Sequence, residues 1–345
     1  MVKCMDKLKN WFIVDAHSDY GLKIYSDYLN KKENSLKEHL NSLRIGNIRL
    51  EALTIGGDFD LFPNMNIREY KTIDNVIKCI ISEIKVNSSE TLLIKNEGDL
   101  KEILKSKKVG FILALEGAGP IGKNLSNLFK LRKLGLRSLM LTHNEKNQFA
   151  DGCMVKEPKG LTKLGKTLIE ELNNLGIIID VSHLSEPSFW DLLKTCEKPI
   201  IASHSNSKTI CNHPRNLTDE QIEAIANTGG VIGINFFSKF LRQDFHKSSI
   251  NDVLKHINYM IDLVGIDHVG LGPDFLDYCI EDLLKLNPQL SVSNKKQFFP
   301  EGLENVESIP RLVISLKESN FSNRDIEKIL GLNFIRVYEK IIREN

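Results

Sequence analysis

Short apolar runs alternate along the chain with stretches whose apolar residues recur at helical spacing. The runs are rich in Ile, Val and Leu and predict strands at about residues 12–17, 48–56, 109–115, 137–142, 177–182, 199–203, 230–236 and 268–273. Several runs are apolar almost throughout, which is typical of parallel strands buried on both faces. Strands and helices in this alternation favour an α/β fold, a TIM-like (β/α)8 barrel, over a sandwich or a helical bundle.

The segments between the runs carry helix signals. Residues 163–176 have apolar positions at helical spacing and end at Gly176, a residue type typical of helix C-termini. Residues 218–230 open with Thr218 and Gln221 at the spacing of a capping box. A doubly wound open sheet is the structural alternative, but it would leave the first and last strands far apart.

Two stretches interrupt the alternation. Residues 58–100 contain a helical pattern at 69–87 and a short apolar LLIK, which indicates an insertion after the second strand. Residues 275–305 form a long connection after the eighth strand, and long loops of this kind are commonly substrate lids. No repeat or linker divides the chain, so we expect a single domain over residues 1–345.

Acids and histidines follow the apolar runs at the point where each run ends. In a barrel of parallel strands the carboxyl ends converge on one pocket, so side chains that follow the ends of the strands are expected to lie close together. The residues concerned are His17, Asp19, Glu116, His143, His183, His204 and Asp274.

Five of these side chains have the chemistry of metal ligands. His17 and Asp19 are two residues apart and point to the same side of a strand, although a hydrogen-bonded turn pair would give the same spacing. Glu116 closes an apolar strand, where an unpaired carboxylate is costly to bury. With His183 and His204 they make a nitrogen and oxygen set that suits two divalent ions, most simply Zn²⁺ bridged by Glu116. Two such ions about 3.5–4 Å apart can share a hydroxide nucleophile.

Three further residues are open to two interpretations each. Asp274 could transfer a proton as general base and then general acid, or it could cap a helix. His143 could stabilise an oxyanion, or it could be a polar loop residue. Arg215 could bind the carboxylate of a small peptide bidentately, or it could lie on the surface. His39, His246 and His256 lie in helical or loop stretches and are predicted to be solvent-exposed.

Composition narrows the functional class. Hydrophobic residues make up 41% and charged residues 26%, which is typical of a soluble globular enzyme. The net charge of +1 argues against nucleic acid or an anionic membrane as a partner, and no apolar run is long enough to span a bilayer. The six cysteines form no CxxC pair, and the N-terminus lacks a signal-peptide pattern, so we expect reduced thiols and a cytoplasmic location.

The chain resembles the membrane dipeptidase (renal dipeptidase) family of amidohydrolase-like metal barrels. The matching segments are DAHSD, LEGAG, LTHNEKNQFADG, IIIDVSHLS, SHSNSKTICNHPRNLTDEQ and GIDHVGLGPDF. The resemblance implies a (β/α)8 barrel with two zinc ions that hydrolyses dipeptides. It implies metal ligation by the five residues above, substrate binding by His143 and Arg215, and proton transfer by Asp274. Relatives pair as dimers, so a homodimer is expected.

The chain departs from the family pattern in two places near the expected pocket. Ala118, Gly119 and Pro120 follow Glu116-Gly117, and Pro273 precedes Asp274. No ligand is lost, so these changes bear on specificity more than on metal binding.

The main hypothesis is therefore a zinc-dependent dipeptidase that uses a metal-bridged hydroxide and accepts small dipeptides, including those with a D-residue at the C-terminal position. One alternative is a two-metal amidohydrolase acting on another small amide, lactam or ester. Another is a non-catalytic metal-binding protein with the same fold.

Overall fold

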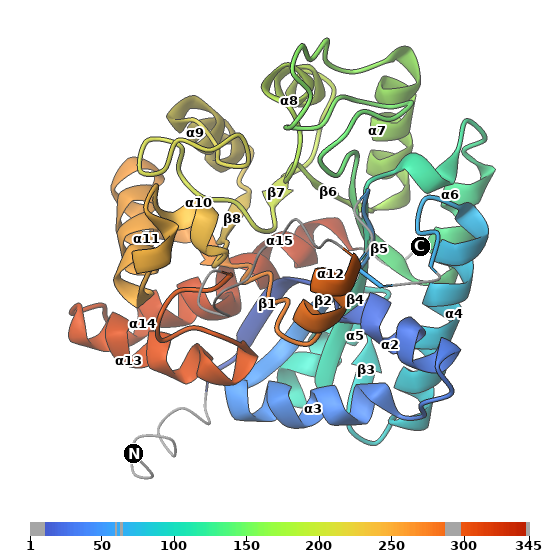
Figure 1. The fold of residues 1–345 in the computed structure, drawn as a ribbon. Helices are drawn as coiled ribbons and strands as arrows, with labels where there is room; N and C mark the ends of the chain where they lie inside the picture. The colour runs from blue at the N-terminus through green and yellow to red at the C-terminus, as the bar shows by residue number, and fades with distance from the viewer. Residues whose placement is uncertain (1–10, 59–60, 63–64, 287–297, 343–345) are drawn as a thin grey trace.

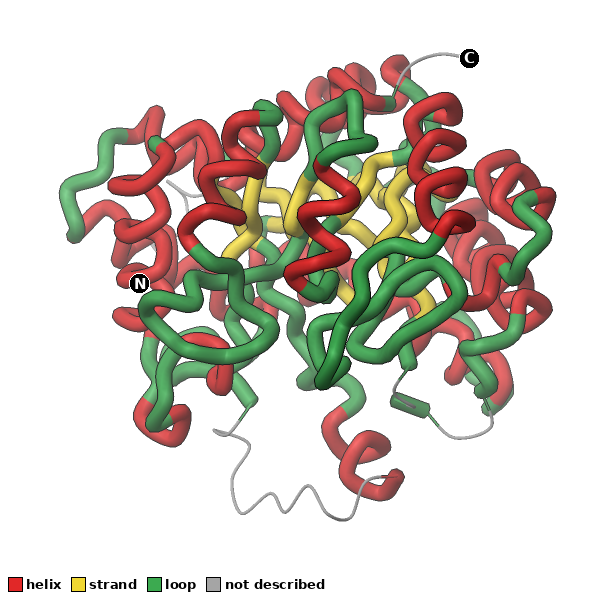
Figure 2. The backbone as a smooth tube through the Cα atoms, turned by 90° about the horizontal axis from the view of Figure 1, so that it is seen from above, coloured by secondary structure: helices red, strands yellow, loops and turns green. Residues whose placement is uncertain are grey.

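A computed structural model describes residues 11–58, 61–62, 65–286 and 298–342. Eight parallel strands form the barrel wall in the order β1-β2-β4-β5-β6-β7-β8-β9, and helices surround them (Figures 1 and 2). The strands are β1 (Ile13–Ser18), β2 (Ile48–Gly56), β4 (Val109–Glu116), β5 (Leu136–Met140), β6 (Ile178–Asp180), β7 (Ile201–Ala202), β8 (Val231–Ile234) and β9 (Val269–Leu271). The prediction of a (β/α)8 barrel is confirmed.

The barrel closes between its first and last strands with the help of a helical segment. Residues of β1 contact β9, although no ladder joins the two strands, and the π-helical segment Lys328–Leu332 contacts both. Because the first and last strands are neighbours, the open-sheet alternative is excluded.

The helices have bounds close to those predicted. Gly176 ends α7 in the left-handed conformation, and Thr218 and Gln221 form the capping box of α9. The helices are α2 (Tyr20–Leu29), α3 (Ser35–Gly46), α4 (Tyr70–Val86), α5 (Glu97–Lys105), α6 (Ser126–Leu134), α7 (Lys163–Leu175), α8 (Glu186–Leu193), α9 (Asp219–Asn227), α10 (Ser238–Leu241), α11 (Ile250–Val264), α12 (Ile280–Leu286), α13 (Ile309–Glu318), α14 (Asn323–Glu327) and α15 (Asn333–Ile341).

The segment predicted as an insertion contributes one more strand to the sheet. Its helix is α4, and its apolar LLIK contains β3 (Thr91–Leu93), which pairs with the first residues of β4. The long connection predicted after the last strand contains α12, and residues 287–297 of that connection lie outside the described residues. A lid role for this connection stays a prediction.

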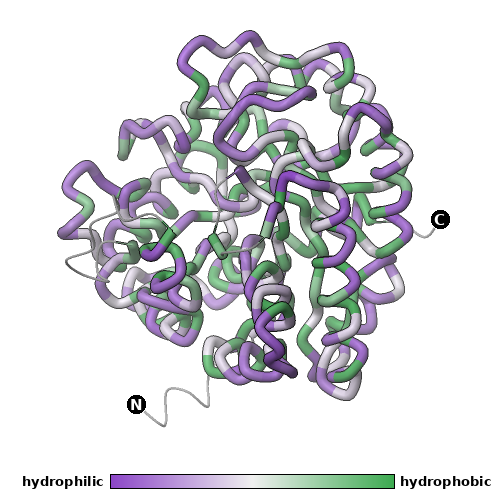
Figure 3. The backbone as a smooth tube through the Cα atoms, turned by 45° about the vertical axis from the view of Figure 1, so that its right-hand side comes forward, coloured by the Kyte–Doolittle hydropathy of each residue, from purple (hydrophilic) through white to green (hydrophobic). Residues whose placement is uncertain are grey.

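Apolar residues from six strands form one buried cluster with the C-terminal helix. Phe334, Val337 and Tyr338 of α15 belong to this cluster, together with Val14, Leu50, Ile112, Ile178, Ile201 and Val231. Gly270 of β9 makes room for the helix, because a Cβ there would lie 2.5 Å from the Phe334 ring. Figure 3 shows hydrophobic segments inside the molecule and hydrophilic ones along its outer turns. In the described parts of the chain, no helix combines the length and apolar composition that crossing a bilayer requires.

Two histidines predicted to be exposed are buried. His39 places Nε2 2.9 Å from both carboxylate oxygens of Glu51, and its ring stacks on Tyr20 with centroids 3.6 Å apart. It lies three residues after Leu36 and four before Leu43, so it belongs to the apolar stripe of α3. His256 is also fully buried, whereas His246 is exposed as predicted.

The burial of His256 gives a prediction about acid stability. Its Nδ1 accepts a hydrogen bond from the Ser207 backbone (3.2 Å), its Nε2 donates to the Leu241 carbonyl (3.0 Å), and burial lowers its pKa to about 4. A lowered pKa means that His256 contributes stability above its unfolded pKa near 6.5, and that this contribution is lost as the pH falls toward 4. Between pH 7 and pH 5 the free energy of unfolding should fall by about 2 kcal/mol through His256.

Urea unfolding at both pH values measures this loss. We expect the fall in the free energy of unfolding between pH 7 and pH 5 to be about 2 kcal/mol smaller in His256→Gln than in the wild type. The fall should be unchanged in His246→Gln, which alters an exposed histidine. Equal losses in the wild type and in His256→Gln would contradict the prediction.

Candidate metal centre

The strand-end residues come together at the carboxyl end of the barrel. His17 lies within β1, Asp19 directly precedes α2, and Glu116 is the last residue of β4. The observed strands β5, β6 and β7 end one or two residues earlier than predicted, and the other side chains project from the loops that follow the strands. These residues are His143, His183, His204 and Asp274, in the loops after β5, β6, β7 and β9.

Glu116 lies at the centre of three imidazoles. Its Oε1 is 3.1 Å from His183 Nε2, 3.7 Å from His204 Nε2 and 3.8 Å from His17 Nε2. The Nε2 atoms of His183 and His204 are only 2.9 Å apart. A single proton can satisfy one of these contacts but not all of them, whereas a cation among the four atoms would satisfy every one.

Two of the imidazoles are oriented through their opposite nitrogen. His17 Nδ1 lies 3.3 Å from the Thr54 hydroxyl, and His204 Nδ1 lies 2.7 Å from the Ser203 hydroxyl. Metal-ligating histidines typically bond through one nitrogen to a fixed partner, which points the other nitrogen at the ion. Both Nε2 atoms therefore present a lone pair to the region around Glu116.

His183 is held in the same way but from a strained backbone. Its Nδ1 lies 3.1 Å from the side-chain oxygen of Asn144. The backbone of His183 has φ 68° and that of Asp274 has φ 60°, both in the left-handed region. For residues other than glycine this conformation costs about 1–2 kcal/mol, and such strain is commonly found at functional sites.

Two aspartates also lie near the third imidazole. His17 Nε2 is 3.8 Å from Asp19 Oδ1 and 3.7 Å from Asp274 Oδ1. Asp274 Oδ2 accepts a 3.0 Å hydrogen bond from the Asn235 amide, but Asp19 Oδ1 is buried and has no hydrogen-bond partner among the residues that the structure describes. A buried carboxylate oxygen left unpaired is costly, and a cation beside it would remove that cost.

Burial and mutual repulsion shift the pKa values of these groups toward their neutral forms. Burial raises the pKa of Asp19 and Glu116 well above the usual range, and nearby carboxylates raise both further. Burial also raises the pKa of Asp274, to about 6. Burial, together with the charge of Arg215, lowers the pKa values of all three histidines, His17, His183 and His204. Neutral imidazoles are ready to bind a metal, and bound cations would stabilise the carboxylates in their ionised form.

The donor set fits two adjacent divalent ions. It contains nitrogen and oxygen atoms but no thiolate, which suits zinc-like ions with open coordination positions. Among the described residues, three groups have ligand atoms within 4.8 Å of one another, and they share members: His17–Glu116–His204, Glu116–His143–His183 and His17–Asp19–Asp274.

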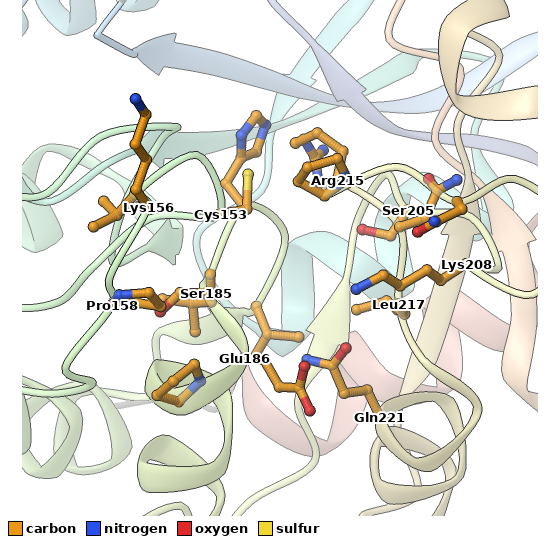
Figure 4. A pocket seen from close by; sticks show the side chains of 18 residues that line it. Cys153, Lys156, Pro158, Ser185, Glu186, Ser205, Lys208, Arg215, Leu217 and Gln221 are labelled. Atoms are coloured by element: carbon orange, nitrogen blue, oxygen red, sulfur yellow. The ribbon is translucent and has the colours of Figure 1, made fainter. Parts of the chain in front are cut away.

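Arg215 is buried beside this centre and forms no ion pair with any acid in the described part of the chain. Its terminal nitrogen donates to the His204 carbonyl (3.0 Å), and its guanidinium lies 5.6 Å from the centre of the Phe240 ring. Its Nε has no hydrogen-bond partner among the described residues. A cavity of about 340 Å³ is lined by His183 and Arg215 together with Cys153, Ser205 and Lys208 (Figure 4). The surface interpretation of Arg215 is therefore wrong, because the side chain is 4% exposed.

His143 lies next to the metal centre and contacts an acid that sequence reasoning missed. Its ring centre is 4.3 Å from that of His183, and its Nδ1 bonds the carboxylate of Asp58. Asn144 and Asn235, which hold His183 and Asp274, were also missed. Asn235 directly follows β8, and Asp58 follows β2 after one intervening residue, Gly57. Both are polar residues at the end of an apolar run, so the criterion that selected the other site residues could have found them.

Comparisons with known proteins agree with this geometry. The family model described as Membrane dipeptidase (Peptidase family M19) matches residues 3–287 and 294–344. An uncharacterized protein from the pqqA 5′ region of Klebsiella pneumoniae is 33% identical over 76% of this chain and 93% of its own length. An uncharacterized dipeptidase of Schizosaccharomyces pombe is 30% identical over 95% of this chain and 80% of its own length.

A solved structure extends the similarity to the fold. It is a metallopeptidase from Rhodobacter sphaeroides bound to a phosphinate mimic of the dipeptide L-Ala-D-Ala. It superposes with a TM-score of 0.80 at 22% identity and covers 96% of this chain and 99% of its own.

Proposed function

The chain belongs to the membrane dipeptidase family and is a metallo-dipeptidase, and from this premise we propose that it cleaves small dipeptides with two zinc ions. The observation that carries the proposal is the convergence of three imidazole Nε2 atoms on Glu116 Oε1, at 3.1 to 3.8 Å. Divalent cations between these buried groups would satisfy all of their contacts at once, and this supports the proposal.

The ligands divide into two sets that share Glu116. His17 and Asp19 would complete one site, and His183 and His204 would complete the other. Bound divalent ions would polarise the peptide carbonyl and lower the pKa of an attacking water. Each set leaves room for substrate, because neither supplies more than three protein ligands.

The remaining residues would act on the substrate itself. Asp274 Oδ1 faces the centre while Asn235 holds Oδ2, so the carboxylate can accept a proton from the attacking water and pass it to the leaving amine. His143, beside His183, would donate a hydrogen bond to the oxyanion of the tetrahedral intermediate.

Arg215 would select short peptides with a free C-terminal carboxylate. Its unpaired Nε and buried position favour an anionic partner, because a guanidinium binds a carboxylate bidentately. The adjoining cavity has space for the C-terminal side chain of a dipeptide. Because the Rhodobacter sphaeroides metallopeptidase binds a mimic of L-Ala-D-Ala, we include a D-residue at this position in the proposal.

A panel of dipeptides tests the proposal. The zinc-loaded protein should hydrolyse L-Ala-L-Ala, L-Ala-D-Ala or related members and leave tripeptides and C-terminal amides uncleaved. Absence of turnover on every member, with two metal ions bound per chain, would overturn the dipeptidase proposal.

Replacing Arg215 tests how the substrate is held. Arg215→Met should raise KM by about 10- to 150-fold, since a charge-assisted hydrogen bond contributes about 1.5–3 kcal/mol, while kcat changes much less. Steady-state kinetics on the best dipeptide measure the effect, and Lys208→Met, which alters a second cation of the same cavity, serves as the comparison. A variant indifferent to the loss of Arg215 would favour a substrate without a carboxylate, such as another amide, a lactam or an ester.

A further inference from the structure

The acid beside His143 comes from a different part of the barrel. Asp58 lies in the connection after β2, and His143 lies in the connection after β5. Asp58 Oδ1 bonds His143 Nδ1, while Asp58 Oδ2 accepts a 2.5 Å hydrogen bond from the backbone of Glu145. Both carboxylate oxygens are therefore occupied, one by the ring and one by the loop that carries the ring.

The backbone around Asp58 is built for this approach. Gly56 and Gly57 have φ of 109° and 107°, which side chains rarely allow, and the Gly57 amide donates a 2.7 Å hydrogen bond to the Glu116 carbonyl. A Cβ on Gly57 would lie 3.7 Å from His143 Nδ1 and 3.9 Å from Glu116 Oε2. The loop thus enters the space between the imidazole and the central carboxylate without filling it.

The contact fixes which nitrogen of His143 carries a proton toward Asp58. The Asp58 backbone N–H also lies 3.0 Å from Nδ1, but an ionised carboxylate competes with it by accepting the Nδ1 proton. Burial alone would raise the pKa of Asp58, yet the hydrogen bonds to the His143 ring and the Glu145 backbone, together with the nearby Arg68 charge, lower that pKa. With Nδ1–H given to Asp58, Nε2 is the ring nitrogen left to face a substrate, and in the structure it lies 3.1 Å from the side-chain nitrogen of Asn144.

We propose that Asp58 is the positioning residue for His143: it holds Nδ1–H and so fixes the ring in the orientation that leaves Nε2 for the substrate. This inference rests on the proposed function. Asp58 does not touch the reacting atoms, so its whole effect should pass through His143, as in other carboxylate–imidazole pairs.

A double-mutant cycle tests this dependence. Asp58→Asn should lower kcat roughly 100-fold with KM changed less than about threefold, because an oxyanion donor loses its orientation. In the His143→Gln background the same Asp58→Asn change should cost less than about threefold. Glu69→Gln, which removes an exposed carboxylate from the same connection, should leave the kinetics unchanged.

A spectroscopic measurement keeps the test independent of turnover. Proton NMR of the protein should show a low-field imidazole N–H resonance that disappears in both His143→Gln and Asp58→Asn and persists in Glu69→Gln. The inference is overturned if Asp58→Asn keeps this resonance, if it leaves kcat intact, or if it costs as much without His143 as with it. If the wild type cleaves no dipeptide, the proposed function fails while the resonance still decides whether Asp58 holds His143.

Discussion

Glu116→Gln should abolish dipeptide hydrolysis and reduce the bound metal from two ions per chain to fewer than one. Glu116 Oε1 lies within 3.8 Å of three imidazole nitrogens, so the substitution removes the one anion that both proposed metal sites share. Losing the metal-activated nucleophile should lower kcat/KM by at least about 1000-fold. Elemental analysis of purified protein and steady-state kinetics measure the two effects.

Stability measurements distinguish this loss from misfolding. The raised pKa of Glu116 means that its carboxyl favours folding only at low pH, and that this contribution is lost as the pH rises through the folded pKa. Metal-free Glu116→Gln should therefore be at least as stable at neutral pH as the metal-free wild type. Glu51→Gln, a buried strand glutamate paired with His39, should instead lose stability while keeping both metals and activity. Two ions retained in Glu116→Gln would contradict the bridging role.

Asp274→Asn should lower kcat by about 100- to 10,000-fold, the usual range for a lost general acid–base, with little change in KM. The carboxylate faces the centre at 3.7 Å from His17 Nε2, and asparagine keeps its shape but accepts no proton. Metal content should stay at two ions per chain, because Asp274 is not among the five proposed ligands.

A neighbouring acid provides the control for Asp274. Asp277 is an exposed aspartate three residues further along the same loop, and Asp277→Asn should keep the wild-type rate. An Asp274→Asn protein with unchanged kcat would show that the proton is carried by another group. Loss of metal in that variant would assign Asp274 to the metal site instead.

The barrel could be predicted because buried parallel strands have a recognisable hydrophobic pattern in the sequence. Strands buried on both faces are continuous apolar runs, and the polar residue that ends each run marks the carboxyl end, as at Glu116 after β4. β3 escaped prediction because a strand of three residues carries too little pattern to distinguish it from a loop.

The burial of single polar residues was not predictable, since it depends on distant partners. His39 and His256 are buried by Glu51 in the next strand and by Ser207 and Leu241 in remote loops. The sequence near a histidine does not indicate which distant residues will pack against it.

Some residues of the site could be predicted from the local sequence pattern, and others could be found only from their contacts in the structure. His17, Asp19 and Glu116 could be selected because each ends an apolar run. Asp58 obeys the same rule but falls where the chain was expected to begin an insertion, so only its contact with His143 reveals it. Arg215 could be recognised from the family resemblance, and its burial excludes the surface interpretation.

Titration of the metal-free protein with Zn²⁺, with dipeptide hydrolysis followed at each addition, tests the central claim most directly. If three imidazoles and two carboxylates assemble a pair of cations that performs the reaction, activity should rise to a plateau at two equivalents of zinc. Full activity at one equivalent, or a doubly loaded protein that leaves every dipeptide intact, would contradict it.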